Sequence, residues 1–146
     1  MKISIGNDHR GVDVKNILKE YLEELNFEVI NEGTDTSNAV DYPIIATKVA
    51  NDVLERRAEL GIVLCGTGIG MSIACNKIPG IRCAKASNVS EAKLSREHNN
   101  ANVLALSSNY DIELLKEMVS VFVKTEFSND ERHVRRLNQI EELENA

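Results

Sequence analysis

The stretch GIVLCGTGIGMSIACNK, residues 61–77, decides the fold of this chain. It begins with a continuous apolar run, turns through three glycines, and continues into a second apolar segment. A strand that is apolar throughout is typical of a sheet covered on both faces. We therefore predict a buried strand at 61–66 and a short helix at 71–77, joined by a glycine-rich turn.

The same alternation continues on both sides of this stretch. Further strands are expected at 2–6, 27–33, 81–86 and 102–107, and further helices at 12–26, 42–57, 111–127 and 132–146. Strand–helix alternation with this spacing predicts a parallel sheet of five strands with helices on both faces and right-handed crossovers. We find no linker or internal repeat, so residues 1–146 are expected to form one α/β domain.

Composition and charge exclude several classes of partner. The net charge of −6 argues against nucleic acid, because phosphate backbones need a basic face. Neither a signal peptide nor an apolar run of membrane-spanning length is seen, so we expect a cytoplasmic protein without a membrane partner. The cysteines, Cys65, Cys75 and Cys83, lack CxxC spacing, which predicts reduced thiols without a disulfide or a zinc site.

Two loops are candidates for a ligand site. Ligands of such sheets bind at the carboxyl ends of the strands, where GNDHRG (6–11) and CGTGIG (65–70) are expected. If the first and third strands are neighbours, both loops open onto one crevice. The glycines would let backbone N–H groups approach a ligand, and the start of the following helix adds partial positive charge. The turn matches neither the dinucleotide fingerprint nor the P-loop, and taken alone it fits tight packing equally well.

The side chains in these loops allow two interpretations each. Cys65 is either a small buried apolar residue or, at the end of a strand beside a helix start, a thiol whose thiolate is favoured. Cys75 and Cys83 lack that setting and are expected in the core. Asp8 and His9 are either a salt-bridged loop pair or an acid–base couple.

The second half of the chain adds polar candidates. His98 is expected near a helix end, where a cation is favoured, and His133 is expected in solvent. Arg132 and Arg136 are four residues apart and share one helix face, which suits either a solvated helix or a phosphate clamp.

Taken together and in order, six motifs resemble one family. They are GNDHRG, NEGT, VDYP, GIVLCGTGIGMSIACNKIPGIRCA, LSREHNNANVLAL and ERHVRRL, and they span nearly the whole chain. They resemble the ribose-5-phosphate isomerase B family, which includes galactose-6-phosphate isomerase subunits. The resemblance implies a Rossmann-like α/β fold and aldose–ketose isomerisation of a sugar phosphate without metal or cofactor. It also implies a homodimer with shared active sites, and leaves a tetramer open.

The resemblance also implies roles for single residues. Cys65 matches the base that removes the proton from C2 of the sugar, and His98 the residue that assists ring opening. The loop Gly66–Gly70, with Thr67, Gly68 and Ile69, matches the part that holds the developing oxyanion. Asp8, His9 and Asn99 match sugar contacts, and Arg132 and Arg136 match phosphate contacts. Some members carry a glutamate where this chain has Met71, which leaves Cys65 as the base.

The predicted topology separates Cys65 from His98. Cys65 ends a strand, whereas His98 precedes the last strand, and a five-residue strand spans about 17 Å. We therefore expect His98, with Arg132 and Arg136 on the C-terminal helix, to serve a site that contains Cys65 of the partner subunit.

Two departures from the family pattern leave the sugar open. Ser107 and Asn109 stand where members often carry a glycine and an arginine, and that arginine helps to bind the phosphate. Arg10 stands where a small residue is common and is the candidate to replace it in part. Ribose 5-phosphate is the expected substrate, with galactose 6-phosphate or allose 6-phosphate as alternatives. A flavodoxin-like module that binds phosphate or nucleotide without chemistry, or a catalytically inactive subunit, is less favoured.

Overall fold

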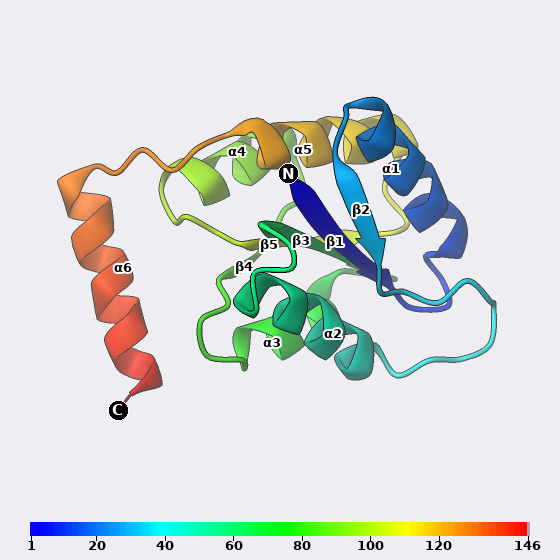
Figure 1. The fold of residues 1–146 in the computed structure, drawn as a ribbon, viewed down its shortest axis with the longest axis horizontal. Helices are drawn as coiled ribbons and strands as arrows, with labels where there is room; N and C mark the ends of the chain where they lie inside the picture. The colour runs from blue at the N-terminus through cyan, green and yellow to red at the C-terminus, as the bar shows by residue number, and fades with distance from the viewer. Residues whose placement is uncertain (146) are drawn as a thin grey trace.

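A computed structural model describes residues 1–145. Residue 146, the last residue of the predicted helix 132–146 and of the predicted domain 1–146, lies outside the described residues. The strands are β1 (Lys2–Asn7), β2 (Glu28–Asn31), β3 (Leu60–Cys65), β4 (Cys83–Lys85) and β5 (Val103–Ser107). They form one sheet in the order β2-β1-β3-β5-β4, and every neighbouring pair is parallel. The predicted five-stranded parallel sheet, with the first and third strands as neighbours, is confirmed (Figure 1).

Helices cover both faces of this sheet. The covering helices are α1 (Val12–Glu24), α2 (Tyr42–Leu54), α3 (Ile69–Asn76), α4 (Val89–Glu97) and α5 (Ile112–Lys124), and a further helix, α6 (Glu131–Glu144), lies on neither face. Figure 1 shows α2 and α3 on one face and α1, α4 and α5 on the other. The buried side chains of β3 alternate accordingly: Ile62 and Leu64 join the core under α1 and α5, and Val63 and Cys65 join the core under α2 and α3.

The glycine turn starts its helix earlier than the sequence pattern indicated. Gly68 has φ +80°, a conformation that glycine adopts without strain, and α3 begins directly after it at Ile69. Thr67 Oγ1 accepts a hydrogen bond from the Ile69 amide at 3.1 Å, which satisfies one of the free donors at the helix start. Ile69 and Gly70, predicted in the loop, therefore form the first turn of α3.

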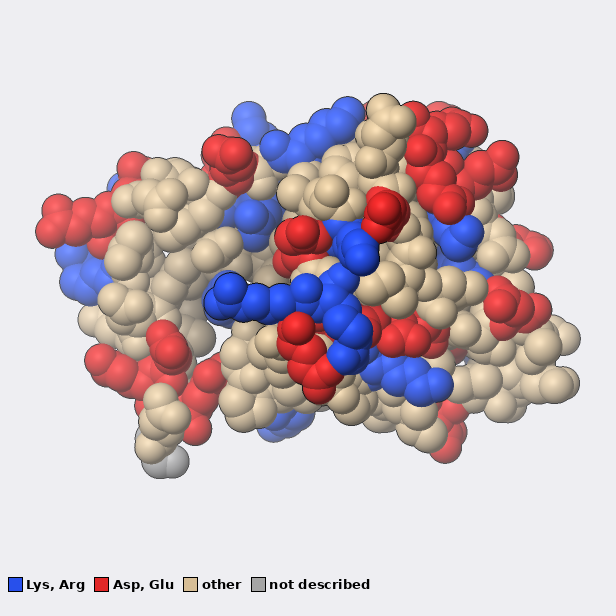
Figure 2. Space-filling model, viewed as in Figure 1, with Lys and Arg blue, Asp and Glu red and all other residues tan. Residues whose placement is uncertain are grey.

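The C-terminal helix stands apart from the layers. The extended segment 125–130 leads from α5 to α6, which lies beside the sheet rather than on either face (Figure 1). At its far end the Gly80 amide donates to the Glu144 carboxylate, at 3.0 Å to Oε1 and 3.2 Å to Oε2. On the face shown in Figure 2, acidic and basic side chains are interspersed over the molecule. No helix within residues 1–145 has the length and apolar character needed to cross a membrane.

Candidate active site

Three neighbouring strands end at one edge of the sheet and bring their loops together. The loops follow β1, β3 and β5, and main-chain hydrogen bonds join them: Asp8 N donates to Leu64 O at 3.1 Å, and Ser108 N to Cys65 O at 2.9 Å. The carboxyl ends of parallel strands meet at one edge, so GNDHRG and CGTGIG open onto the same side, as predicted.

Cys65 is held by its own turn. The side chain is 6% exposed, and its Sγ accepts a hydrogen bond from the Gly68 amide at 3.1 Å. An N–H aimed at the sulfur stabilises negative charge there. A Cβ on Gly68 would lie 2.9 Å from the main-chain carbon of Leu106, so only glycine lets the turn pack against β5. Of the predicted oxyanion donors, the Gly68 amide is thus engaged with Cys65 and the Ile69 amide with Thr67.

The Gly66 peptide is fixed from the β5 side. Its carbonyl accepts hydrogen bonds from Ser107 Oγ at 2.7 Å and from Asn109 Nδ2 at 2.9 Å. Ser107 and Asn109, the two departures from the family pattern, therefore brace the glycine turn in this chain. The sequence offered no signal for these contacts, because they join segments about forty residues apart.

The β1 loop presents Asp8 and His9 in separate environments. The buried Asp8 carboxylate accepts the Arg10 amide at 3.0 Å, and His9 Nδ1 accepts the Val40 amide at 3.3 Å. A neutral His9 with an accepting Nδ1 carries its proton on Nε2, which leaves that N–H as a donor. Within residues 1–145 Asp8 and His9 form no ion pair with each other, so the salt-bridged interpretation is wrong.

Residues 32–41 form a segment that packs against this loop and positions His9. Asn7 Nδ2 donates to Thr34 O at 3.1 Å, and the completely buried Lys15 ammonium pairs with the exposed Asp35 carboxylate. The hydrogen bond from Lys15, followed by that from Asn31, lowers the pKa of Asp35 below its ordinary value. Together with the Val40 contact, these bonds hold the segment on the site.

A second group of polar residues gathers where α4 ends and α6 begins. His98 caps α4, and its ring stacks on that of His133 with centroids 4.3 Å apart and planes 21° from parallel. The Ser128 amide donates to Glu97 O at 3.1 Å, which brings the start of α6 to this place. His133 is 7% exposed rather than in solvent, which corrects the prediction.

His133 has an environment that disfavours its charged form. Its Nε2 is buried and finds no hydrogen-bond partner within residues 1–145. Burial lowers the pKa of His133, and the neighbouring charges of His98 and Arg132 lower it further. Arg132 and Arg136, one turn apart on α6, flank this pair, and Asn99 follows His98 directly.

The two groups lie at opposite ends of the parallel strands. The Cys65 group consists of Asp8, His9, Cys65 and the turn Gly66, Thr67, Gly68, Ile69 and Gly70. The His98 group consists of His98, Asn99, Arg132, His133 and Arg136. Cys65 pairs with Ser107 at the carboxyl end of β5, whereas His98 precedes Val103 at its amino end. A strand of this length separates its ends by about 17 Å, so one subunit does not bring the groups together.

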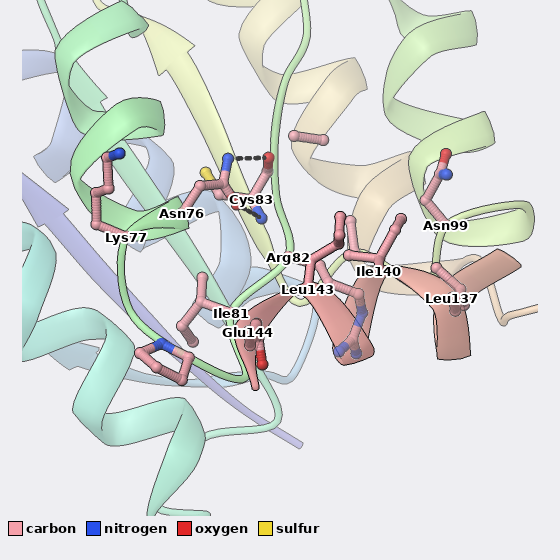
Figure 3. Close-up of a pocket in the computed structure, with 13 residues that line it drawn as sticks. Asn76, Lys77, Ile81, Arg82, Cys83, Asn99, Leu137, Ile140, Leu143 and Glu144 are labelled. Carbon is pink, nitrogen blue, oxygen red and sulfur yellow. Dashed lines mark hydrogen bonds between the residues drawn. The ribbon is translucent and has the colours of Figure 1, made fainter. Parts of the chain in front are cut away.

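The pocket drawn in Figure 3 lies away from Cys65. A cavity of about 610 Å³ separates α6 from β4 and the end of α3, and Leu137, Ile140 and Leu143 of α6 line one wall. Asn99 contributes to the opposite side (Figure 3). None of the lining residues belongs to the loops around Cys65, so this cavity is a feature of the α6 side of the molecule.

Further contacts near Cys65 were missed by the sequence analysis. The Tyr42 ring packs on Gly70, where a Cβ would lie 2.6 Å from Tyr42 Cζ. The motif VDYP contains this tyrosine and was the only sign of it in the sequence.

All three cysteines are free, with Cys75 buried and Cys83 half-buried. Within residues 1–145 no group of three or more His, Cys, Asp or Glu side chains is placed to hold a metal ion.

Comparisons with known proteins identify the family of this chain. The family described as Ribose/Galactose Isomerase matches residues 3–140. Ribose-5-phosphate isomerase B of Escherichia coli is 40% identical, over 98% of this chain and 96% of its own. Ribose-5-phosphate isomerase B of Clostridium thermocellum superposes with a TM-score of 0.96 at 44% identity, covering 99% of this chain and 98% of that one.

A third relative was solved with a sugar phosphate. Ribose-5-phosphate isomerase B of Mycoplasma genitalium, with bound ribulose-5-phosphate, superposes with a TM-score of 0.93 at 37% identity, covering 99% of this chain and 96% of that one. The family model matches residues 3–140, and the relatives are similar along nearly their whole length, which together identify the family of this chain. This chain belongs to the ribose/galactose isomerase family.

Proposed function

We propose that this protein interconverts ribose 5-phosphate and ribulose 5-phosphate, with Cys65 as the base. The observation that carries the proposal is the Cys65 thiol at the end of β3, with the Gly68 N–H directed at its sulfur. The relatives named ribose-5-phosphate isomerase B support the choice of sugar. Galactose 6-phosphate is the second candidate, because the family description includes galactose isomerases.

The reaction needs one base and a donor for the developing oxyanion. The Cys65 thiolate removes the proton from C2 of the open-chain aldose, and the C–H electrons form the C1–C2 double bond of an enediolate. The electron pair of the C1 carbonyl moves to its oxygen, and a proton passes from the C2 hydroxyl to that oxygen. The thiol then returns its proton to C1, and C2 becomes the carbonyl carbon of the ketose. The negative oxygen of the enediolate is stabilised by the amides of the glycine turn and the first turn of α3 that are not engaged with Cys65 or Thr67, and by the Nε2–H of His9. The Gly68 bond to sulfur stabilises the thiolate that begins the sequence.

The remaining functions come from the His98 group of a second subunit. In the proposed homodimer His98 assists opening of the sugar ring, and Arg132 and Arg136 bind the phosphate. Three arginines in the first turns of α6 lie at the positive end of the helix dipole, and the acidic residues Glu141, Glu142 and Glu144 lie at the other end. The arginine-bearing end of α6 is therefore suited to an anion.

Exposed apolar side chains support the homodimer. Ile69 and Ile73 on α3 are 52% and 57% exposed, next to the Cys65 turn, and Leu143 on α6 is 74% exposed. Ile69 and Ile73 lie one turn apart on α3, and neighbouring exposed apolar side chains of this kind are typical of surfaces that become buried on association. We propose that α6 of one subunit packs against the partner and brings the His98 group to the Cys65 group.

An isomerase assay tests the function directly. We expect turnover of ribose 5-phosphate by the wild type in excess chelator, and a fall in kcat of about 100- to 10,000-fold in Cys65→Ala, because the base is removed. Cys83→Ala, which removes a half-buried thiol on β4, is the matched control and should keep its activity. A wild type without turnover would contradict the proposed function, and loss of activity in chelator would contradict a metal-independent reaction. Measuring kcat/KM for galactose 6-phosphate and allose 6-phosphate in parallel identifies the preferred sugar.

A further inference from the structure

The side chain of Arg10 lies against the glycine turn, directly beside Cys65. A Cβ on Gly66 would lie 3.2 Å from Arg10 Nη1 and 3.5 Å from its Cδ. The guanidinium group therefore reaches from the end of β1 across to the end of β3, the strand that carries Cys65. A positive charge is thus positioned at the edge of the sheet where the proposed reaction takes place.

Both sides of this contact are fixed by hydrogen bonds. On the β1 side, the buried Asp8 accepts the Arg10 amide at its carboxylate, at 3.0 Å, and the Gly11 amide at its main-chain oxygen, at 3.1 Å. On the β3 side, Ser107 and Asn109 hold the Gly66 carbonyl. Arg10 therefore extends from a rigid turn over a rigid peptide.

The guanidinium group of Arg10 has no partner of its own. Within residues 1–145 it forms no ion pair and donates no hydrogen bond, although the residue is exposed and its backbone is held. Three other arginines are engaged within residues 1–145: Arg57 pairs with Asp52, Arg96 donates to the Thr125 carbonyl, and Arg82 donates to the Asn100 carbonyl. The remaining arginines lack a partner in the described part of the chain, as Arg10 does, and what distinguishes Arg10 is its place against the Gly66 turn. A planar group with five N–H donors and no internal acceptor matches the oxygens of a phosphate.

We propose that Arg10 binds the phosphate of the substrate from the subunit that provides Cys65. This inference rests on the proposed function, since it takes the substrate to be a sugar phosphate. The phosphate is at the far end of the short carbon chain whose C2 meets Cys65, and the long Arg10 side chain starts from the neighbouring strand. Arg132 and Arg136 of the partner subunit approach the same phosphate, so that both subunits hold it.

Steady-state kinetics with charge-matched variants test this assignment. In Arg10→Gln we expect KM for ribose 5-phosphate to rise about 10- to 100-fold with kcat changed less than about threefold, because a charge-assisted contact to a non-reacting group is lost. The inhibition constant of inorganic phosphate should rise in parallel. Arg10→Lys keeps the positive charge but loses the paired N–H donors of the guanidinium group, so its KM and phosphate inhibition constant should lie between those of the wild type and Arg10→Gln. Arg56→Gln is the control: Arg56 is exposed at the opposite end of β3, and its loss should change neither constant.

Each outcome decides between the alternatives. KM and phosphate inhibition within about twofold of wild type in Arg10→Gln would overturn the assignment, and so would a fall in kcat with unchanged KM, which would place Arg10 on the reacting centre instead. An equal change in Arg56→Gln would show a general charge effect and would also overturn it. A wild type without isomerase activity would overturn the proposed function itself, and the assignment of Arg10 with it.

Discussion

Cys65 and Gly68 depend on each other. The sulfur receives the Gly68 amide only because Gly68 adopts φ +80° and passes within contact distance of the Leu106 and Ser107 main chain. The proposed base and the amide that donates to it are thus positioned by backbone geometry rather than by another side chain. A change at Gly68 should disturb the chemistry before it disturbs the rest of the fold.

Gly68→Ala is expected to lower both activity and stability. An alanine must adopt a left-handed conformation, at a cost of about 1–2 kcal/mol, and its Cβ meets backbone that cannot move aside. We expect kcat for ribose 5-phosphate to fall at least about tenfold. Gly80→Ala is the comparison, since Gly80 has φ +89° but a Cβ there meets only the end of the Leu54 side chain. Both variants should unfold at lower urea concentration, and a Gly68→Ala enzyme with the kcat of Gly80→Ala would contradict this role.

The sequence predicted which candidate residues lie at the same end of the sheet better than it predicted their contacts. Cys65, Asp8 and His9 were predicted at one edge because strand ends can be read from apolar runs. The contacts of Arg10 with Gly66 and of Val40 with His9 were not, because they join segments whose distance depends on the path of loops. Loop paths have no periodic signal in a sequence.

At the scale of elements, the junction of α4 and α6 is the feature that the sequence hid. His133 lies among arginines and glutamates, a pattern typical of a solvated helix, yet it is buried because its partner His98 comes from another helix. The strands, by contrast, were predicted well: β3 and β5 carry no polar side chain except the final Ser107 and are buried along their whole length. Amphipathic periodicity reveals which face of a helix is polar, but not which neighbour covers it.

The buried His133 predicts a dependence of stability on pH. Its pKa is lowered in the folded protein, so the unfolded chain binds the proton more readily. The stability that neutral His133 contributes is complete above the ordinary pKa of 6.5 and is lost as the pH falls through the lower folded value. In His133→Phe, which keeps a stacked ring without a proton site, the free energy of unfolding should fall less between about pH 7.5 and about pH 5.5. Urea unfolding of both proteins at the two pH values measures this, and identical losses would contradict it.

For the whole molecule, the separation of the two groups is the central property. Cys65 lies at the carboxyl ends of the strands and His98 at their amino ends, and α6 stands clear of the layers (Figure 1). We propose that the two groups are halves of one site, which do not meet within a single chain. The proposed dimer joins each half to the complementary half of the partner.

Mixing two inactive chains tests this arrangement. Cys65→Ala and His98→Asn each damage both sites of their own homodimer, but a heterodimer of the two has one site with neither change. Random pairing should restore about a quarter of the wild-type activity, because half of the dimers are mixed and each has one intact site. The control replaces His98→Asn by the double variant Cys65→Ala/His98→Asn, which leaves no intact site. Heterodimers confirmed by mass spectrometry but without activity would show that the site is not shared.

The buried Lys15 has a consequence for the order in which the molecule opens. Its charge is completely buried and its partner, the exposed Asp35 carboxylate, has a lowered pKa. As the pH falls through that value, Asp35 becomes neutral and a buried cation is left without its counter-charge, which favours local unfolding of residues 32–41. His9 then loses the Val40 amide that orients its ring. Acid is therefore expected to open the segment over His9 while the sheet behind it stays folded.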